Sequence, residues 1–176
     1  MPKGVRKTRT FSIDSELIDS LEKEAANREI STSELMNQMI LRSSKLTWPA
    51  EKTGAIIIAR DIIQDLIEHY SEEELRKIAT KAAQRHKNTL IVVYGIKQNL
   101  ESVLDLVKNL LGNYARWFKF THNVNGRNNK ILLNHEIGLK WSCFIDAYMQ
   151  SFFLEMLDIP VKSSYTSNTI ILEFAS

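Results

Sequence analysis

The sequence has little cysteine and no long apolar run, and both facts limit the class of protein. Cys143 is the single cysteine, so no disulfide can form within the chain, which fits a reducing compartment. The longest apolar runs, 55–59 and 90–94, are far too short to span a bilayer. The basic N-terminus is not followed by the apolar stretch of a signal peptide. We therefore expect a cytoplasmic protein with no membrane partner, and we interpret Cys143 as a small core residue.

The sequence also lacks the local motifs of metal binding and catalysis. None of its histidines has His-x-His or His-x-x-x-His spacing, and a Cys-x-x-Cys pair is absent. There is neither a glycine-rich phosphate loop nor a Gly-x-Ser-x-Gly motif. We therefore expect no metal site, no cofactor and no enzyme activity. The four histidines are His69, His86, His122 and His135.

What the chain does contain is enough apolar sequence for a core and a basic N-terminal arm. Its 176 residues are 44% hydrophobic and carry a net charge of only +2. A chain of this length holds one domain, or a small module followed by a second domain. The first ten residues contain Lys3, Arg6, Lys7 and Arg9 and no acid. Such an arm suits a polyanionic partner, although a solvated basic terminus has the same composition.

Residues 6–46 show the pattern of one strand and two helices. In 6–13 the polar and apolar residues alternate, which predicts a short strand. Asp14 or Ser15 then caps a helix with an apolar stripe that begins at Leu17. Ser31 and Glu34 have the spacing of a capping box, which predicts a second amphipathic helix. So short a segment cannot bury its own stripes, and a lone strand has unpaired edges, so we expect two copies to pair.

These residues resemble the ribbon-helix-helix superfamily of DNA-binding repressors and antitoxins. The resemblance covers 6–46 and rests on Thr8-Arg-Thr-Phe-Ser-Ile-Asp-Ser-Glu-Leu and Ile30-Ser-Thr-Ser-Glu-Leu-Met. It implies an intertwined homodimer, with a tetramer left open, whose two-stranded ribbon enters the major groove of double-stranded DNA. It therefore implies a transcriptional regulator.

The resemblance also implies which side chains would contact DNA. The base contacts would come from Arg6, Thr8, Thr10 and Ser12, although the last three also suit the wet face of an ordinary edge strand. The start of the second helix suits a phosphate because its amides are free and its dipole end is positive. The phosphate contacts would come from Lys3, Lys7, Arg9, Ser31, Thr32 and Ser33.

A second domain is expected to follow a linker. We predict a ribbon-helix-helix module at 1–46, a linker at 47–54 where Trp48-Pro49 breaks the helix, and an α+β domain at 55–176. That domain should have a mixed or antiparallel sheet of about five strands packed on helices. The predicted strands are 55–59, 114–123, 130–136, 161–165 and 169–174. The predicted helices are 61–70, one from Ser71 with Glu74 as capping box, 100–111 and 138–157, with 88–95 favouring a helix end.

An aromatic stripe in 138–157 is the candidate ligand pocket of the second domain. Its predicted lining is His135, Trp141, Phe144 and Tyr148, although such a stripe also suits plain core or a dimer face. The arrangement of elements, with the segment His135-Glu-Ile-Gly-Leu-Lys-Trp-Ser-Cys-Phe, resembles the carboxy-terminal domain of archaeal ribbon-helix-helix proteins. This resemblance implies no known ligand, so the small-molecule or protein effector stays open.

Three functions are compatible with these patterns. The first is a homodimeric transcriptional regulator whose second domain senses an effector or builds oligomers. The second is an antitoxin with autoregulatory DNA binding, although residues 54–176 are longer and more apolar than a typical antitoxin tail. In the third, the strand and two helices serve only to dimerise, and the second domain binds a protein partner.

Overall fold

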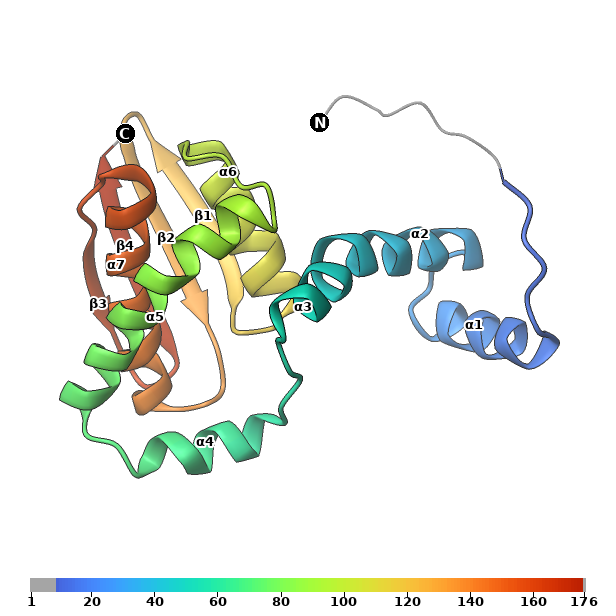
Figure 1. Ribbon diagram of the computed structural model, residues 1–176, viewed down its shortest axis with the longest axis horizontal. Coiled ribbons are helices and arrows are strands. Elements are labelled where there is room, and N and C mark those ends of the chain that lie inside the picture. The colour runs from blue at the N-terminus through green and yellow to red at the C-terminus, as the bar shows by residue number, and fades with distance from the viewer. Residues whose placement is uncertain (1–8, 176) are drawn as a thin grey trace. The chain divides into compact units, whose positions relative to one another are not determined.

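The computed structural model describes residues 9–175, and the chain divides into two compact units, Met1–Ser43 and Ser44–Ser176. The helices and a single four-stranded antiparallel sheet make the protein α+β, as the sequence predicted. In Figure 1 the described part of the first unit is blue, and the second unit runs from cyan to red along the chain. Each unit has its own architecture.

The first unit, called unit 1 below, is a pair of helices. Helix α1 spans Ser15–Asn27 and α2 spans Thr32–Arg42. The Ser31 side chain caps α2 by accepting a hydrogen bond from the Glu34 amide at 3.1 Å. Residues 9–14 form no strand, so the predicted strand at 6–13 is not seen in its described part. The physical reason is that a strand needs a neighbour, and this single chain offers none there.

The second unit, called unit 2 below, begins with helix where a linker was predicted. A π-helix spans Ser43–Thr47 and α3 spans Trp48–Thr53. Pro49 does not end the helix, because it stands in the first turn of α3, a position where proline is tolerated, directly after the π-helix. Gly54, with a φ of +69°, ends α3.

The predicted strand at 55–59 is also corrected by the structure. These residues lie outside every strand of the sheet, and the side chain of Ile57 is fully exposed. The apolar, β-branched composition that predicted a buried strand is therefore present without a sheet partner or cover from its own chain.

Four helical segments follow in unit 2 before the sheet. They are α4 at Arg60–Glu68, α5 at Glu72–Val92, α6 at Leu100–Asp105 and the π-helix η2 at Leu106–Tyr114. The predicted capping box of α5 is confirmed, because Ser71 and Glu74 bond each other's backbone amides. The preference for helix at 88–95 is confirmed as far as Val92.

The sheet has the strand order β1-β2-β4-β3, with every pair antiparallel. Strands β1 (Lys119–Asn125) and β2 (Asn128–Asn134) form a hairpin, and so do β3 (Lys162–Tyr165) and β4 (Thr169–Ala175). The hairpins join where β2 pairs with β4, with Ile131 opposite Leu172. The sheet therefore has four strands, one fewer than expected, because 55–59 stays outside it.

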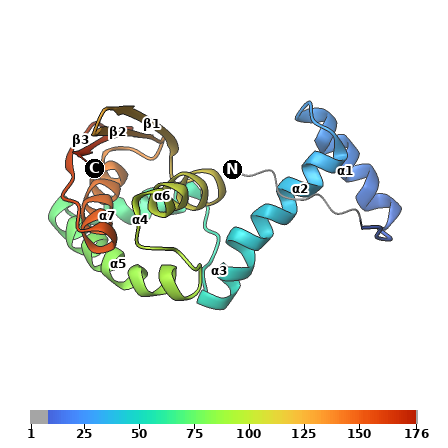
Figure 2. The ribbon, with the colours of Figure 1, turned by 90° about the horizontal axis from the view of Figure 1, so that it is seen from above.

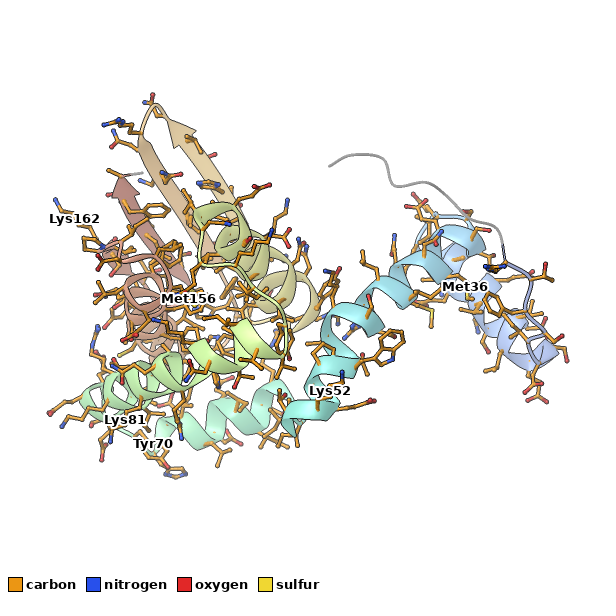
Figure 3. All side chains as sticks on the ribbon, turned by 45° about the horizontal axis from the view of Figure 1, so that its top comes forward. Met36, Lys52, Tyr70, Lys81, Met156 and Lys162 are labelled. Atoms are coloured by element: carbon orange, nitrogen blue, oxygen red, sulfur yellow. The ribbon has the colours of Figure 1, made fainter. Side chains whose placement is uncertain are left out.

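Helix α7, at Leu139–Leu157, is the centre of unit 2. Eleven of its nineteen residues are buried because α5 covers one side and the sheet covers the other. Figure 2 shows the resulting order of sheet, α7 and α5. In Figure 3 Met156 of α7 lies among the packed side chains, whereas Lys162 of β3 points away from them.

Replacing Gly138 by alanine should destabilise the protein. Gly138 begins α7 with φ +102° and ψ 179°, a conformation that is almost exclusive to glycine. We expect Gly138→Ala to lower the free energy of unfolding by about 1–3 kcal/mol in urea titration. The control is Gly126→Asn in the β1–β2 turn, because at φ +59° asparagine is tolerated. Equal stability of the two variants would contradict this.

Candidate interaction surfaces

Unit 1 has an apolar face that its own described residues leave uncovered. Its buried apolar side chains are Ala25 and Leu35, where α1 and α2 pack together. Seven large apolar side chains in the described part of unit 1 are exposed, and we refer to them together as the unit 1 apolar face. They are Phe11, Ile13, Leu17, Ile18, Met39, Ile40 and Leu41.

The apolar face is too large for so small a unit to leave in water. Covering one such side chain completely contributes roughly 1.5–3 kcal/mol. Two helices that bury one alanine and one leucine have almost no core of their own. An exposed apolar surface of this kind in a folded protein marks an interaction site.

The side chains predicted to contact DNA are not gathered into a site. Lys3, Arg6, Lys7 and Thr8 lie outside the described residues. Arg9, Thr10 and Ser12 are exposed in an extended segment that belongs to no strand. At the start of α2, Ser31 acts as the helix cap, while Thr32 and Ser33 occupy the first turn.

In unit 2, the predicted pocket residues form a row of stacked rings. Trp141 and Phe144 stack with centroids 5.1 Å apart, and Tyr148 continues the row 6.2 Å from Phe144. Phe152 follows at 5.8 Å, and Trp117 packs edge-on against Trp141, Phe144 and Tyr148. Stacked and edge-on contacts at these separations are favourable for aromatic rings.

This aromatic row fills the interior instead of lining a cavity. Two shallow hollows in the described surface, of about 400 and 550 Å³, are lined by other residues. The larger lies between α6 and β1, beside Asp105, Lys108 and Phe120. Burial raises the pKa of Tyr148, which keeps its hydroxyl neutral; that hydroxyl lies 3.2 Å from Nδ1 of His86. Of the interpretations given for the aromatic stripe, ordinary core packing describes what is observed.

His135 is the predicted pocket residue that lies apart from the aromatic row. Its Nδ1 accepts a hydrogen bond from the Ile137 amide at 3.2 Å, and its Nε2 lies 2.8 Å from Oγ of Ser142. The Nδ1 atom must therefore be unprotonated. Burial, helped by the charge of Arg60, lowers the pKa of His135 to about 4. The neutral ring thus ties the end of β2 to the first turn of α7.

A polar cluster around the buried carboxylate of Asp146, which the sequence analysis missed, connects α5, α7 and β3. Arg76 Nη1 donates to Oδ2 of Asp146 at 3.0 Å, and its Nη2 donates to the Tyr165 hydroxyl at 3.0 Å. Gln150 also donates to Oδ2 of Asp146 at 3.1 Å. The Asp146 carboxylate is almost wholly buried, and its second oxygen has no partner among the described residues.

One sequence signal could have drawn attention to this cluster. Asp146 stands in the middle of a helix that is otherwise strongly apolar, and a buried carboxylate requires a cationic or hydrogen-bonding partner. The identity of that partner is a matter of tertiary structure, because Arg76 lies 70 positions earlier in the chain.

Two general kinds of site can be assessed in the part of the chain that the structure describes. No group of three or more His, Cys, Asp or Glu side chains comes together there as a metal site. Among those same residues, no helix combines the length and the apolar character needed to cross a bilayer.

Comparisons with known proteins were made by family, by sequence and by structure. No family model matches the chain, and no curated protein matches it. Among solved structures it is similar to trafficking protein particle complex subunit 3 from Naegleria fowleri, whose structure is covalently bound to palmitic acid. The two chains share 11% sequence identity at a TM-score of 0.46, over 66% of this chain and 90% of that one.

The comparison corrects the predicted function of a DNA-binding transcriptional regulator. The similar structure is a subunit of a trafficking protein complex and not a DNA-binding regulator or an antitoxin. The partner predicted from the ribbon-helix-helix resemblance, double-stranded DNA, is corrected with it.

Acid should destabilise the protein through His135. Its folded-state pKa of about 4 lies below the unfolded value of about 6.5, so below pH 6.5 the unfolded chain binds the proton more readily. Stability should therefore fall by on the order of 2 kcal/mol between pH 6.5 and pH 4. His135→Gln should flatten this part of the pH dependence in urea titrations, whereas His69→Gln at an exposed position should not. Identical pH slopes for wild type and His135→Gln would contradict the assignment.

Removing the guanidinium from the buried polar cluster should also destabilise unit 2. Arg76→Leu leaves the buried Asp146 carboxylate without its cation, which should cost about 2–3 kcal/mol. The neighbouring variant Lys77→Leu removes only the exposed Lys77–Glu73 pair and should cost less than about 0.5 kcal/mol. The check is the free energy of unfolding from denaturant titration; equal losses would show that Asp146 does not depend on Arg76.

Proposed function

We propose that this protein is a self-associating adaptor, in which unit 1 joins two copies and unit 2 presents surfaces to protein partners. The observation that carries the proposal is the unit 1 apolar face. Seven large apolar side chains of unit 1 stand exposed, while its helix pair buries only Ala25 and Leu35. A second copy of the same helix pair supplies the missing cover.

The ribbon-helix-helix resemblance describes how two copies would interlock. In such a dimer the extended segments before α1 pair antiparallel, and the apolar sides of α1 and α2 from both copies form one core. Residues 9–14 are exposed and belong to no helix or turn, and Phe11 and Ile13 alternate with polar side chains along them. Both features support this arrangement, because the pairing satisfies the backbone and buries the two apolar side chains.

Dimerisation through unit 1 would bring two copies of unit 2 together. Two copies of unit 2 held by one dimeric unit 1 form a bivalent molecule, which binds a partner with two matching sites more tightly than one copy does. Unit 2 suits this role because it has its own core around α7. The function proposed is therefore assembly of proteins, without a role for DNA.

The dimer can be tested with one substitution on α1. Leu17→Lys places a charge in the centre of the proposed interface and should weaken dimerisation at least tenfold, equivalent to about 1.4 kcal/mol. The matched control is Asp19→Lys, two residues along the same helix on its polar side, which should leave the dimer intact. Sedimentation velocity should give twice the 20.3 kDa chain mass for wild type and the control.

Two further measurements keep this test decisive. Thermal unfolding of unit 2 should be unchanged in Leu17→Lys, which excludes general misfolding as the cause of dissociation. A wild-type protein that sediments as a monomer at micromolar concentration would overturn the proposed function.

A further inference from the structure

Residues 55–59, with the sequence Ala-Ile-Ile-Ile-Ala, have the composition of a buried strand and the environment of a surface loop. Ile57 is 100% exposed and Ile56 is 83% exposed. Three consecutive β-branched residues are typical of a strand that is covered on both faces. Unit 2 contains no element that covers them among its described residues.

The backbone of this segment is also unpaired. Ala55 donates back to Ala50 of α3, and Ala59 accepts from Ile63 of α4. Between these two bonds, the amides and carbonyls of Ile56, Ile57 and Ile58 have no hydrogen-bond partner in the described part of the chain. An uncharged, apolar strand edge in this state is a template for pairing with another strand.

Helix α4 continues the uncovered surface. Only part of the apolar side of α4 is covered by the core of unit 2. Ile67 is buried and Ile63 is half-buried, whereas Ile62 and Leu66 are about half exposed. Ile62 and Leu66 are one helical turn apart and follow directly after the exposed segment. We call residues 55–59 with Ile62 and Leu66 the isoleucine edge.

We propose that the isoleucine edge is a second self-association surface, in which residues 55–59 of two copies pair as antiparallel strands centred on Ile57. The pairing is isologous, since each copy contributes the same segment. It satisfies the free amides and carbonyls of both copies and brings the exposed isoleucines into one shared apolar layer.

The chemistry of the surface favours a second copy over a membrane. The five residues from Ala55 to Ala59 carry no charge, so two copies meet without repulsion at the centre. Along α4 the exposed side chains beside the apolar arc include Asp61, Asp65 and Glu68. These carboxylates are repelled by an anionic lipid surface, whereas they can remain in water at the rim of a dimer.

The area of the isoleucine edge is also appropriate for a dimer. The exposed parts of its side chains amount to a few hundred Å² per copy, on the order of a small interface and below the ~800 Å² per partner of a standard one. The inference rests on the proposed function in one respect. A dimeric unit 1 would hold two isoleucine edges at an effective concentration near the millimolar range, which a modest interface requires.

Cysteine cross-linking tests the pairing directly in the full-length chain. Antiparallel strands centred on Ile57 place the two Ile57 Cα atoms about 4.5–5.5 Å apart, within the range of a disulfide. With the buried Cys143 replaced by alanine, Ile57→Cys should form a covalent dimer under mild oxidation. The matched control is Val124→Cys, an exposed apolar position on β1, which should remain uncross-linked.

Hydrogen exchange supplies the second measurement. In wild type the amides of residues 56–58 should exchange at least about tenfold more slowly than in Ile57→Asp, because pairing protects them. The Ile57→Asp protein should still sediment as a dimer through unit 1, which separates the two interfaces.

The outcomes distinguish this inference from the proposed function. Cross-linking at position 57 together with slow exchange supports the pairing. A dimer by sedimentation with fast exchange at 56–58 and no cross-link overturns the inference and leaves the unit 1 dimer standing. Slow exchange without a cross-link also overturns it, because another segment then covers the edge. A monomer by sedimentation with fast exchange rejects both.

Discussion

The amount of apolar surface that a short segment can cover by itself is the constraint on which the rest depends. Two helices with Ala25 and Leu35 as their buried contact cannot shield Leu17, Ile18 and Met39 from water. The same shortage recurs in unit 2 at 55–59, where three isoleucines follow one another outside the sheet. In both proposals a second molecule would supply the missing cover, so one physical cause accounts for both features.

Unit 2 shows the opposite situation, because α7 is covered on nearly every side. Its rings stack from Trp141 to Phe152, so the space that a ligand would need is occupied. The cost of placing Asp146 in this helix is offset by Arg76 and Gln150. The centre of unit 2 is therefore packed core, built around α7.

Local sequence signals predicted the elements whose causes are local. The Ser71–Glu74 box and the helix around Trp141 were found where the sequence placed them. Both predicted hairpins were found too, although the strand predicted at 114–123 begins only at Lys119, because Tyr114 still belongs to η2. The prediction of a buried strand at 55–59 was wrong. An apolar, β-branched composition indicates that a segment is suited to a covered strand, but it does not indicate whether the same chain supplies the cover. The Arg76–Asp146 pair was missed for a related reason, since 70 residues separate its partners. Resemblance at 6–46 predicted DNA binding, and the structural comparison corrected that function.

The position of β4 in the sheet has a consequence for biosynthesis. β4 pairs with both β2 and β3, yet it follows every other strand in the chain. The sheet of unit 2 therefore cannot close until β4 has left the ribosome, whereas unit 1 emerges more than a hundred residues earlier. In the proposed unit 1 dimer, nascent chains on one messenger RNA would have time to meet through their helix pairs while unit 2 is still incomplete. Assembly at this stage would favour partners translated side by side.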